Sequence, residues 1–285
     1  MATLPKVVGR VRDLRAQVAS FRAEGARVAL VPTMGALHAG HVALAEKARE
    51  LAQRTVVSIF VNPTQFAPHE DFSQYPRTLE ADLYKLADVG VDLVYAPTPT
   101  EMYPAGFVTR IAVGGPSEGL ETDFRPHFFG GVATVVGKLF IQCAPDYAMF
   151  GEKDYQQLKV VTRLSRDLDL GVEVVGLPTI REEDGLALSS RNAYLDEEQR
   201  TIAPVIYTAL TRAADAIRTG TAPQAAVSVA RGMIEALGLK VDYVAARNAD
   251  TLAPLKEGTE AGREPIRLLA AAWLGETRLI DNIAV

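Results

Sequence analysis

The pattern of apolar and polar positions predicts alternating strands and helices up to about residue 177. Short, wholly apolar runs are separated by segments with helical spacing, in which apolar residues recur every three or four positions. The predicted strands are Val28–Thr33, Thr55–Val61, Val91–Tyr95, Tyr147–Phe150 and Val172–Leu177, and the predicted helices are His41–Ala52, Leu79–Asp88, Gly131–Cys143 and Tyr155–Leu168. Strands that are apolar throughout indicate a parallel sheet covered on both faces, so we predict an α/β fold with a Rossmann-type sheet.

The composition changes near Gly176. A polar, turn-rich segment, residues 178–192, is followed by a different order of elements. The predicted helical stretches here are Asp196–Arg218 and Pro223–Leu237, and the predicted strands are Val241–Ala246, Ile266–Leu274 and Arg278–Ile283. Helices followed by consecutive strands suggest a smaller α+β domain. We therefore assign residues 1–176 to the Rossmann-type domain and residues 177–285 to a smaller C-terminal domain.

Composition and charge narrow the function. The 285 residues are 48% hydrophobic and 23% charged, which is enough for two globular domains with a core. The sequence contains no stretch of about 18 uninterrupted apolar residues, and Met1–Asp13 lacks the apolar core of a signal peptide, so we expect a cytoplasmic protein without a membrane span. The single cysteine, Cys143, excludes an internal disulfide. A net charge of −5 without a basic run disfavours a nucleic-acid partner.

The segment PTMGALHAGH, residues 32–41, follows the first predicted strand and begins the first predicted helix. Free N–H groups at a helix start favour phosphate, and His38 and His41, three residues apart, could both face one anion. A P-loop is rejected, because His41 and Val42 stand where Lys and Ser or Thr are required. Metal ligation is disfavoured with only four His in the chain, and two His without a function are the remaining alternative.

Two further segments bear polar side chains suited to a nucleotide and a small acid. Ser189, Ser190 and Arg191 place two hydroxyls and a guanidinium in succession, a good clamp for a triphosphate. The segment FGEKDYQQ, residues 150–157, follows a predicted strand and supplies Lys153 for phosphate and Gln157 for a neutral substrate group. Gln65 follows another strand, although for either glutamine alone an ordinary solvated loop residue is the better interpretation.

H-A-G-H resembles the H-x-G-H signature of the nucleotidyltransferase superfamily, and the Ser-Ser-Arg segment is similar to its K-M-S-K-S loop. Over residues 32–283 the chain resembles the pantoate–β-alanine ligase family. The resemblance is carried by PTMGALHAGH, SIFVNPTQF, YPRTLEADL, GVATVVGKLF, FGEKDYQQL, DGLALSSRNAYL and TRLIDNI. These segments are long and specific.

The resemblance implies ATP-dependent ligation of pantoate and β-alanine to pantothenate through a pantoyl-adenylate, with release of pyrophosphate and AMP. It also implies Mg²⁺, a homodimer and a C-terminal domain that acts as a lid. The catalytic residues implied are His38, His41, Lys153, Ser189, Ser190 and Arg191, and those implied for pantoate are Gln65, Gln157, Met34 and Phe60. The ATP site implied comprises Pro32, Thr33, Met34, His38, Gly40, His41, Gly151, Lys153, Asp154, Leu188, Ser189, Ser190 and Arg191, with Asp82 for the metal.

One segment departs from the family. The family pattern R-P-G-H-F-x-G-V is met here by residues 125–132, RPHFFGGV, so that Phe128 stands in place of His and His127 lies one position early. The Gly- and Pro-rich residues 114–126 could form a flap over the site or a plain surface loop. Two rival functions remain. An adenylyltransferase acting on a phosphate ester would need cationic groups in place of Gln65 and Gln157, and an inactive nucleotide-binding regulator is favoured by Phe128 alone.

Overall fold

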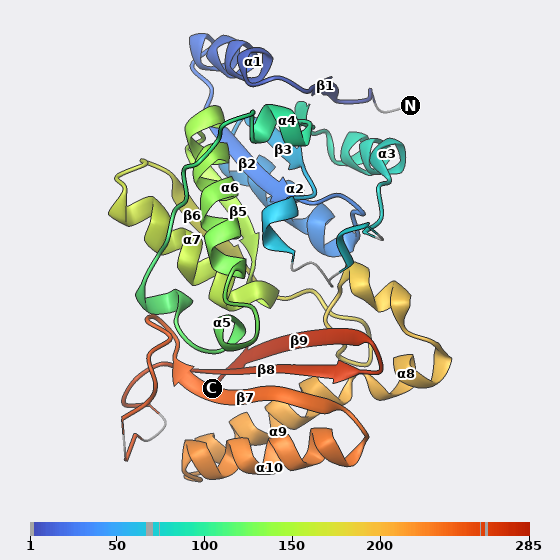
Figure 1. Ribbon diagram of the computed structural model, residues 1–285, viewed down its shortest axis with the longest axis vertical. Coiled ribbons are helices and arrows are strands. Elements are labelled where there is room, and N and C mark those ends of the chain that lie inside the picture. Colours follow the sequence, from blue (N-terminus) through green and yellow to red (C-terminus); the bar gives the residue numbers. More distant parts are fainter. Residues whose placement is uncertain (1–2, 67–70, 74, 257, 260–261) are drawn as a thin grey trace.

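Two sheets organise the chain, one parallel and one antiparallel (Figure 1). The computed structural model describes residues 3–66, 71–73, 75–256, 258–259 and 262–285. The six-stranded sheet has the order β1-β4-β3-β2-β5-β6, and every neighbouring pair in it is parallel. Its strands are β1 (Lys6–Val8), β2 (Val28–Thr33), β3 (Arg54–Ile59), β4 (Leu93–Tyr95), β5 (Tyr147–Gly151) and β6 (Glu173–Leu177). The predicted Rossmann-type sheet is confirmed.

The strand order creates a switch point between β2 and β5. The chain moves outward from β2 to β3 and β4, and then returns to the other side of β2 with β5 and β6. Connections leave β2 and β5 in opposite directions, which leaves a crevice beyond their carboxyl ends. The loop with His38 and His41 follows β2, and the turn with Lys153 follows β5. The fold therefore brings the predicted phosphate-binding segments to the same crevice.

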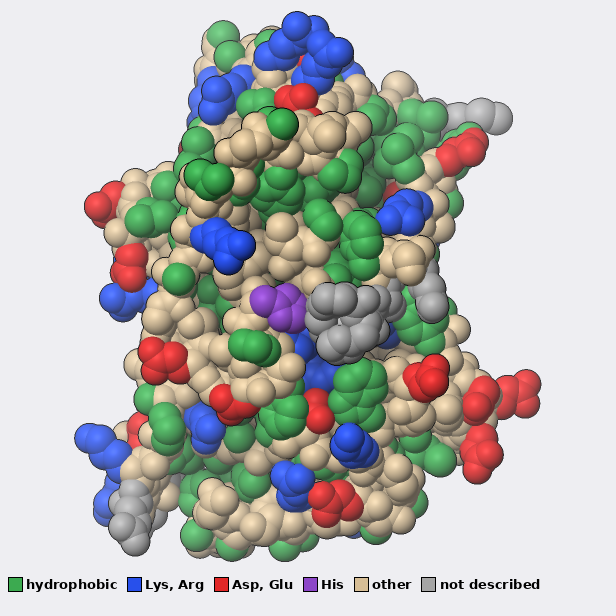
Figure 2. All heavy atoms as spheres, in the orientation of Figure 1, with side chains coloured by type: hydrophobic (Ala, Val, Ile, Leu, Met, Phe, Trp, Pro, Cys, Tyr) green, Lys and Arg blue, Asp and Glu red, His purple; other side chains and the backbone are tan. Residues whose placement is uncertain are grey.

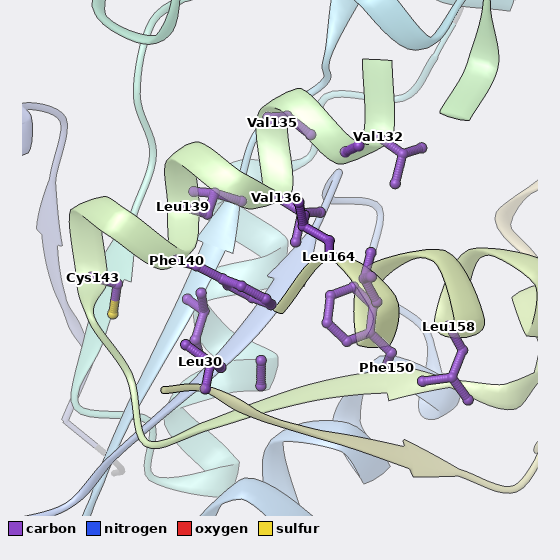
Figure 3. Packing of buried hydrophobic residues seen from close by; sticks show 14 of the residues in the cluster. Leu30, Val132, Val135, Val136, Leu139, Phe140, Cys143, Phe150, Leu158 and Leu164 are labelled. Atoms are coloured by element: carbon purple, nitrogen blue, oxygen red, sulfur yellow. The ribbon is translucent and has the colours of Figure 1, made fainter. Parts of the chain in front are cut away.

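Successive strand residues bury opposite faces of the sheet, as the pleat requires. Leu30 and Val56 pack against α1, α6 and α7, whereas Ala29 and Val57 pack against α2 and α3. Figure 3 shows the first of these layers, where Phe140 of α6 lies over Leu30 of β2. The helices are α1 (Val11–Ala23), α2 (Ala39–Leu51), α3 (Leu79–Val89), α4 (Pro99–Met102), α5 (Glu121–Phe124), α6 (Phe128–Cys143) and α7 (Tyr155–Asp167).

The second part of the chain forms the smaller antiparallel layer. Strands β7 (Lys240–Asn248), β8 (Ile266–Leu274) and β9 (Thr277–Ala284) pair in sequence order, and α9 (Val205–Arg218) and α10 (Pro223–Ala236) cover one face of them (Figure 1). The predicted continuous helix Asp196–Arg218 is wrong, because α8 (Glu197–Ile202) ends before Pro204 and α9 begins after it. Proline has no N–H to continue the helical hydrogen bonds.

The charged side chains are unevenly spread over the face shown in Figure 2. Basic side chains gather over α1, and over the rest of that face acidic and basic side chains are interspersed. Within the described residues, the structure has no helix with both the length and the apolar character needed to cross a bilayer. Cys143, at the end of α6, is buried in the core beside the six-stranded sheet.

Candidate active site

A cavity of about 1290 Å³ lies between the two sheets. Its upper wall comes from the carboxyl ends of β2, β3 and β5 and from α6, and its lower wall comes from residues 177–192 and from β7, β8 and β9. Ligands of open parallel sheets bind at this edge. All the residues predicted for ATP, pantoate or catalysis contribute to the lining; Asp82, predicted for the metal, does not.

His38 and His41 begin α2 and are held by their own backbone. His38 is the N-cap residue, and its Nδ1 accepts a hydrogen bond from the Gly40 N–H at 3.1 Å. The Nδ1 of His41 accepts from the His38 N–H at 3.3 Å. A side chain at Gly40 would meet the His38 ring, since a Cβ there would lie 2.9 Å from its Cε1 atom. Glycine at this position therefore lets His38 fold back over the helix start.

Burial keeps both imidazoles neutral. The pKa of His41 is lowered to about 3, first by burial and then by the proximity of His38 and of the Lys153 ammonium, which disfavour a second positive charge there. The pKa of His38 is also lowered, by burial first and by Lys153 next. Because each Nδ1 is an acceptor, the neutral rings carry their proton on Nε2. The cavity wall thus offers two uncharged N–H donors, a suitable arrangement for phosphate oxygens.

Asp82 and Lys85 of α3 hold the loop that precedes α2. The Asp82 carboxylate accepts the N–H groups of Ala36 and Leu37 at 3.0 and 2.9 Å and the hydroxyl of Thr78 at 3.2 Å. The Lys85 ammonium donates to the Leu37 carbonyl. Asp82 is fully buried and does not contribute to the cavity lining. Its geometry is that of a residue that positions the His38–His41 loop.

Gln65 faces the cavity with a defined amide orientation. The Tyr103 hydroxyl donates to Asn62 Oδ1 at 2.9 Å, and Asn62 Nδ2 donates to Gln65 Oε1 at 2.8 Å. Gln65 therefore keeps its Nε2 donors for a ligand. Arg125 donates to the Gln65 carbonyl at 3.2 Å, and its guanidinium lies 3.9 Å from the centre of the Phe128 ring. Phe128 contributes to the cavity lining, whereas His127 is exposed and does not contribute to it.

The Lys153 turn and the Ser189–Arg191 turn both line the cavity. Lys153 belongs to the 3-10 turn η4 (Glu152–Asp154), which joins β5 to α7. Ser189 caps the turn η5 (Ser190–Tyr194) by accepting from the Arg191 N–H at 3.2 Å. The hydroxyl of Ser190 lies 3.3 Å from that of Tyr75, so this turn touches the segment between β3 and α3. Among the described residues, no three His, Cys, Asp or Glu side chains are grouped to hold a metal.

Sequence reasoning missed a buried polar cluster at the junction of the two sheets. Glu121 of α5 is bound by Arg278 at 2.8 Å and by the Tyr243 hydroxyl at 2.9 Å. Gln156 holds the segment that precedes Glu121, because its Nε2 group donates to the carbonyls of Pro116 and Gly119. Residues 114–126 are therefore anchored to both parts of the chain. The available signal was the pair Gln156-Gln157, of which only Gln157 was assigned a role.

The fold and this site place the chain among the nucleotide-using enzymes with a Rossmann-type sheet. Within that class, the chain belongs to the pantoate–β-alanine ligase family, whose model matches residues 6–284. It is thus an enzyme of the ligase class.

Relatives cover the whole chain. The pantothenate synthetase of Mesorhizobium japonicum is 60% identical over 282 residues, 99% of this chain and 98% of its own. A solved pantothenate synthetase from Thermus thermophilus has a TM-score of 0.90 at 48% identity and covers 98% of both chains. The Francisella tularensis pantoate–β-alanine ligase, complexed with β-γ ATP and β-alanine, has a TM-score of 0.82 at 32% identity, covering 98% of this chain and 97% of its own.

Proposed function

We propose that this protein joins pantoate and β-alanine to form pantothenate, using ATP and passing through a pantoyl-adenylate. The observation that carries the proposal is the meeting of two neutral imidazoles, Lys153 and the Ser189–Arg191 turn in one cavity with the amides of Gln65 and Gln157. The first set suits a triphosphate, and the amides suit a small hydroxy-acid. Family membership and the ATP and β-alanine complex of the Francisella relative support the same function.

In the first step a carboxylate oxygen of pantoate attacks the α-phosphorus of ATP. The new P–O bond forms as the bond to the β-phosphate oxygen breaks, and pyrophosphate leaves. The Nε2–H donors of His38 and His41 stabilise the charge on the phosphate oxygens, and Lys153 with Ser189, Ser190 and Arg191 binds the leaving pyrophosphate. The rest of the predicted ATP site, Pro32, Thr33, Met34, Gly40, Gly151, Asp154 and Leu188, surrounds the nucleotide.

Gln65 orients the acid for this attack. Its Nε2 group donates to an oxygen of pantoate, and Gln157 supplies a second neutral amide from α7. The side chains of Met34 and Phe60 provide an apolar wall for the two methyl groups. Holding carboxylate and α-phosphate together in this way lowers the entropic part of the barrier, so the step needs no covalent enzyme intermediate.

In the second step the amine of β-alanine attacks the acyl carbon of the adenylate. The C–N bond forms, the C–O bond to AMP breaks, and the amine loses a proton to solvent or to the departing phosphate. AMP and pantothenate leave the cavity. Opening and closing of residues 177–285 over residues 1–176, as a lid over its site, would admit substrates and release these products.

Mg²⁺ fits this site as part of the substrate. The Asp82 carboxylate is buried and receives three hydrogen bonds, so it does not fit direct coordination of the ion. We propose that Mg²⁺ enters on the phosphates of ATP, since it prefers phosphate oxygens and its own waters. We also propose a homodimer, on the family resemblance, and, on composition and charge, a cytoplasmic protein without a nucleic-acid or membrane partner.

The test is release of pyrophosphate and AMP from Mg-ATP by the purified protein, with pantoate and β-alanine added singly and together. We expect pyrophosphate in the presence of pantoate alone, and AMP with pantothenate only when both acids are present. An absence of turnover in folded protein under every combination would contradict the proposal and favour a nucleotide-binding regulator.

A further inference from the structure

Asn282, on the edge strand β9, is bound to the turn that carries Lys153. The side chain is 3% exposed, and its Nδ2 group donates to the carbonyls of Glu152 at 2.9 Å and Lys153 at 2.8 Å. These hydrogen bonds connect the C-terminal sheet to a turn of the first domain that lies more than a hundred residues earlier in the chain. The backbone of Lys153, which we propose to bind phosphate, is thus held by a strand of the C-terminal sheet.

The contacts of Asn282 require an amide. Arg267 donates from Nε to Asn282 Oδ1 at 2.6 Å, and because a guanidinium can only donate, this contact fixes which amide atom is oxygen. The two Nδ2 hydrogens then meet two carbonyl oxygens, which can only accept. Arg267 is itself held by Glu152 at 3.0 Å and lies 4.0 Å from the centre of the Tyr155 ring. An amide suits these partners fully, whereas a carboxylate would have no proton for the carbonyls.

The neighbouring residue, Asp281, reaches the other phosphate-binding segment. Arg181 binds its carboxylate with two hydrogen bonds, of 2.7 and 2.9 Å, and also donates to the Gly185 carbonyl at 3.0 Å. Residues 180–188 form a small hairpin that leads directly into Ser189. The two neighbouring side chains are also linked to each other, since Asp281 Oδ1 accepts the backbone N–H of Asn282 at 2.7 Å. Adjacent residues of β9 are therefore connected to both the Lys153 turn and the Ser189–Arg191 turn.

We propose that Asn282 is a positioning residue for the adenylation step, and that with Asp281 it fixes the Lys153 turn relative to the Ser189–Arg191 turn. Neither residue contacts substrate in this role. The inference rests on the proposed phosphate-binding role of Lys153. A triphosphate held between the two turns depends on their separation, because a displacement of about 1 Å lowers the rate of a positioned reaction by about 100-fold.

The decisive substitution is Asn282→Asp, which keeps the shape and the contact with Arg267 but faces two carbonyl oxygens with an oxygen. We expect the rate of pyrophosphate release with pantoate to fall by about 10- to 100-fold. In a Lys153→Ala background the same substitution should lower the remaining rate by less than about twofold, because residues that act as a unit are not additive. The proposal would be overturned if Asn282→Asp lowered the rate by the same factor in the parent protein and in Lys153→Ala. It would also be overturned if Asn282→Asp reacted at the normal rate.

A matched control is Asn248→Asp at the end of β7. Asn248 likewise donates through Nδ2, here to Glu264 at 2.7 Å, and accepts backbone N–H groups through Oδ1, but it lies outside the cavity lining. This variant should melt at a lower temperature and keep its rate at temperatures where it is folded. If Asn282→Asp does not fold, Asn282→Ala, which removes the amide donors without adding charge, takes its place in the same cycle.

A readout without turnover separates this inference from the proposed function. A crystal structure of the Asn282 variant should show the Glu152–Asp154 turn displaced by more than about 0.5 Å, the tolerance of a well-held site. An unmoved turn refutes the positioning role, whatever reaction the protein performs. If instead Lys153→Ala leaves pyrophosphate release unchanged while the turn moves, the role given to Lys153 is wrong and the structural connection to Asn282 stands.

Discussion

The imidazole rings of His38 and His41 lie 4.1 Å apart, centroid to centroid, at the first turn of α2. Each accepts a backbone N–H through Nδ1, so the start of the helix orients both rings. Backbone N–H groups hold the pair in place through Nδ1, which leaves Nε2 of each ring as the donor that we propose for phosphate. Several expectations depend on this arrangement.

Replacing His41 by Ala removes one of the two donors. We expect the rate of pyrophosphate release to fall by about 100- to 1000-fold, the usual result of deleting one donor that stabilises developing charge. Loss of the capping contact should lower the free energy of unfolding by only about 1 kcal/mol, which melting curves can check. The exposed His127 is the control, since His127→Ala should react at the normal rate. A near-normal rate for His41→Ala would refute the phosphate role.

The free energy of unfolding should fall as the pH is lowered, because His41 is neutral in the folded protein. The folded pKa of His41 is about 3, below the ordinary value of 6.5. Protonation of the unfolded chain therefore begins first, and the stability that the neutral ring provides is complete above pH 6.5 and is lost as the pH falls toward 3. The free energy of unfolding should drop by about 1 kcal/mol per pH unit in this range. Urea unfolding at several pH values should show a smaller slope for His41→Gln and an unchanged slope for His127→Gln.

Asp82→Asn distinguishes a positioning residue from a metal ligand. The amide would turn an N–H group toward one of the donors that the buried carboxylate now satisfies. We expect the free energy of unfolding to fall by about 1–3 kcal/mol and the activity to fall with it. Higher Mg²⁺ concentrations should not restore the rate, and restoration would show a metal role instead. Asp88→Asn, on the exposed face of the same helix, should change stability by less than about 0.5 kcal/mol.

Two adjacent glycines of α6 give a matched pair. A Cβ at Gly131 would lie 2.4 Å from the Thr64 carbonyl oxygen, whereas one at Gly130 would meet nothing nearer than 4.0 Å. Gly131→Ala should push away the turn that carries Gln65 and raise KM for pantoate by about tenfold or more, since about 1.4 kcal/mol of lost binding is tenfold. Gly130→Ala should bind pantoate normally and be more stable by up to about 1 kcal/mol. Equal behaviour of the two variants would contradict this account of the α6 contact.

Phe128 should act through Arg125. Loss of the ring in Phe128→Ala removes a cation–π contact of about 1–2 kcal/mol and loosens the guanidinium that binds the Gln65 carbonyl. We expect KM for pantoate to rise by about tenfold. Phe128→Tyr and Phe128→His keep a flat ring under the guanidinium and should stay close to the parent. If Phe128→Ala binds pantoate normally, the stacked pair has no part in the site.

Most of the fold could be predicted because its signals are local. Strands such as β2 are apolar throughout, and the buried residues of α2 recur every three or four positions. Of the N-terminal elements, β1 was not predicted because a strand of three residues carries little pattern, whereas α1 was overlooked although Leu14, Val18 and Phe21 recur at helical spacing. The break at Pro204 was missed for another reason: apolar spacing continues across it, and only the missing N–H ends the helix.

Site residues in contiguous motifs could likewise be predicted, whereas those that depend on tertiary packing could not. His38, His41, Lys153 and the Ser189–Arg191 turn lie in contiguous motifs, and the structure brings them to one cavity. The division near Gly176 and the individual roles of these residues stay predictions. The burial of Asp82 could not be predicted, because it depends on how α3 packs under a loop more than forty residues away. Asn282 lies in the segment TRLIDNI, but the sequence assigned it no role, and only the contact of β9 with the Lys153 turn suggests one.

The position of Cys143 gives the chain a built-in reporter of its own unfolding. Burial raises the pKa of this thiol to about 12, and only the thiolate reacts with alkylating or oxidising reagents. Because Cys143 is buried in the core beside the six-stranded sheet, we expect the folded protein to be silent toward such reagents. Labelling of this single sulfur therefore measures the rate at which the whole nucleotide-binding layer comes apart, and that rate sets the working lifetime of the protein.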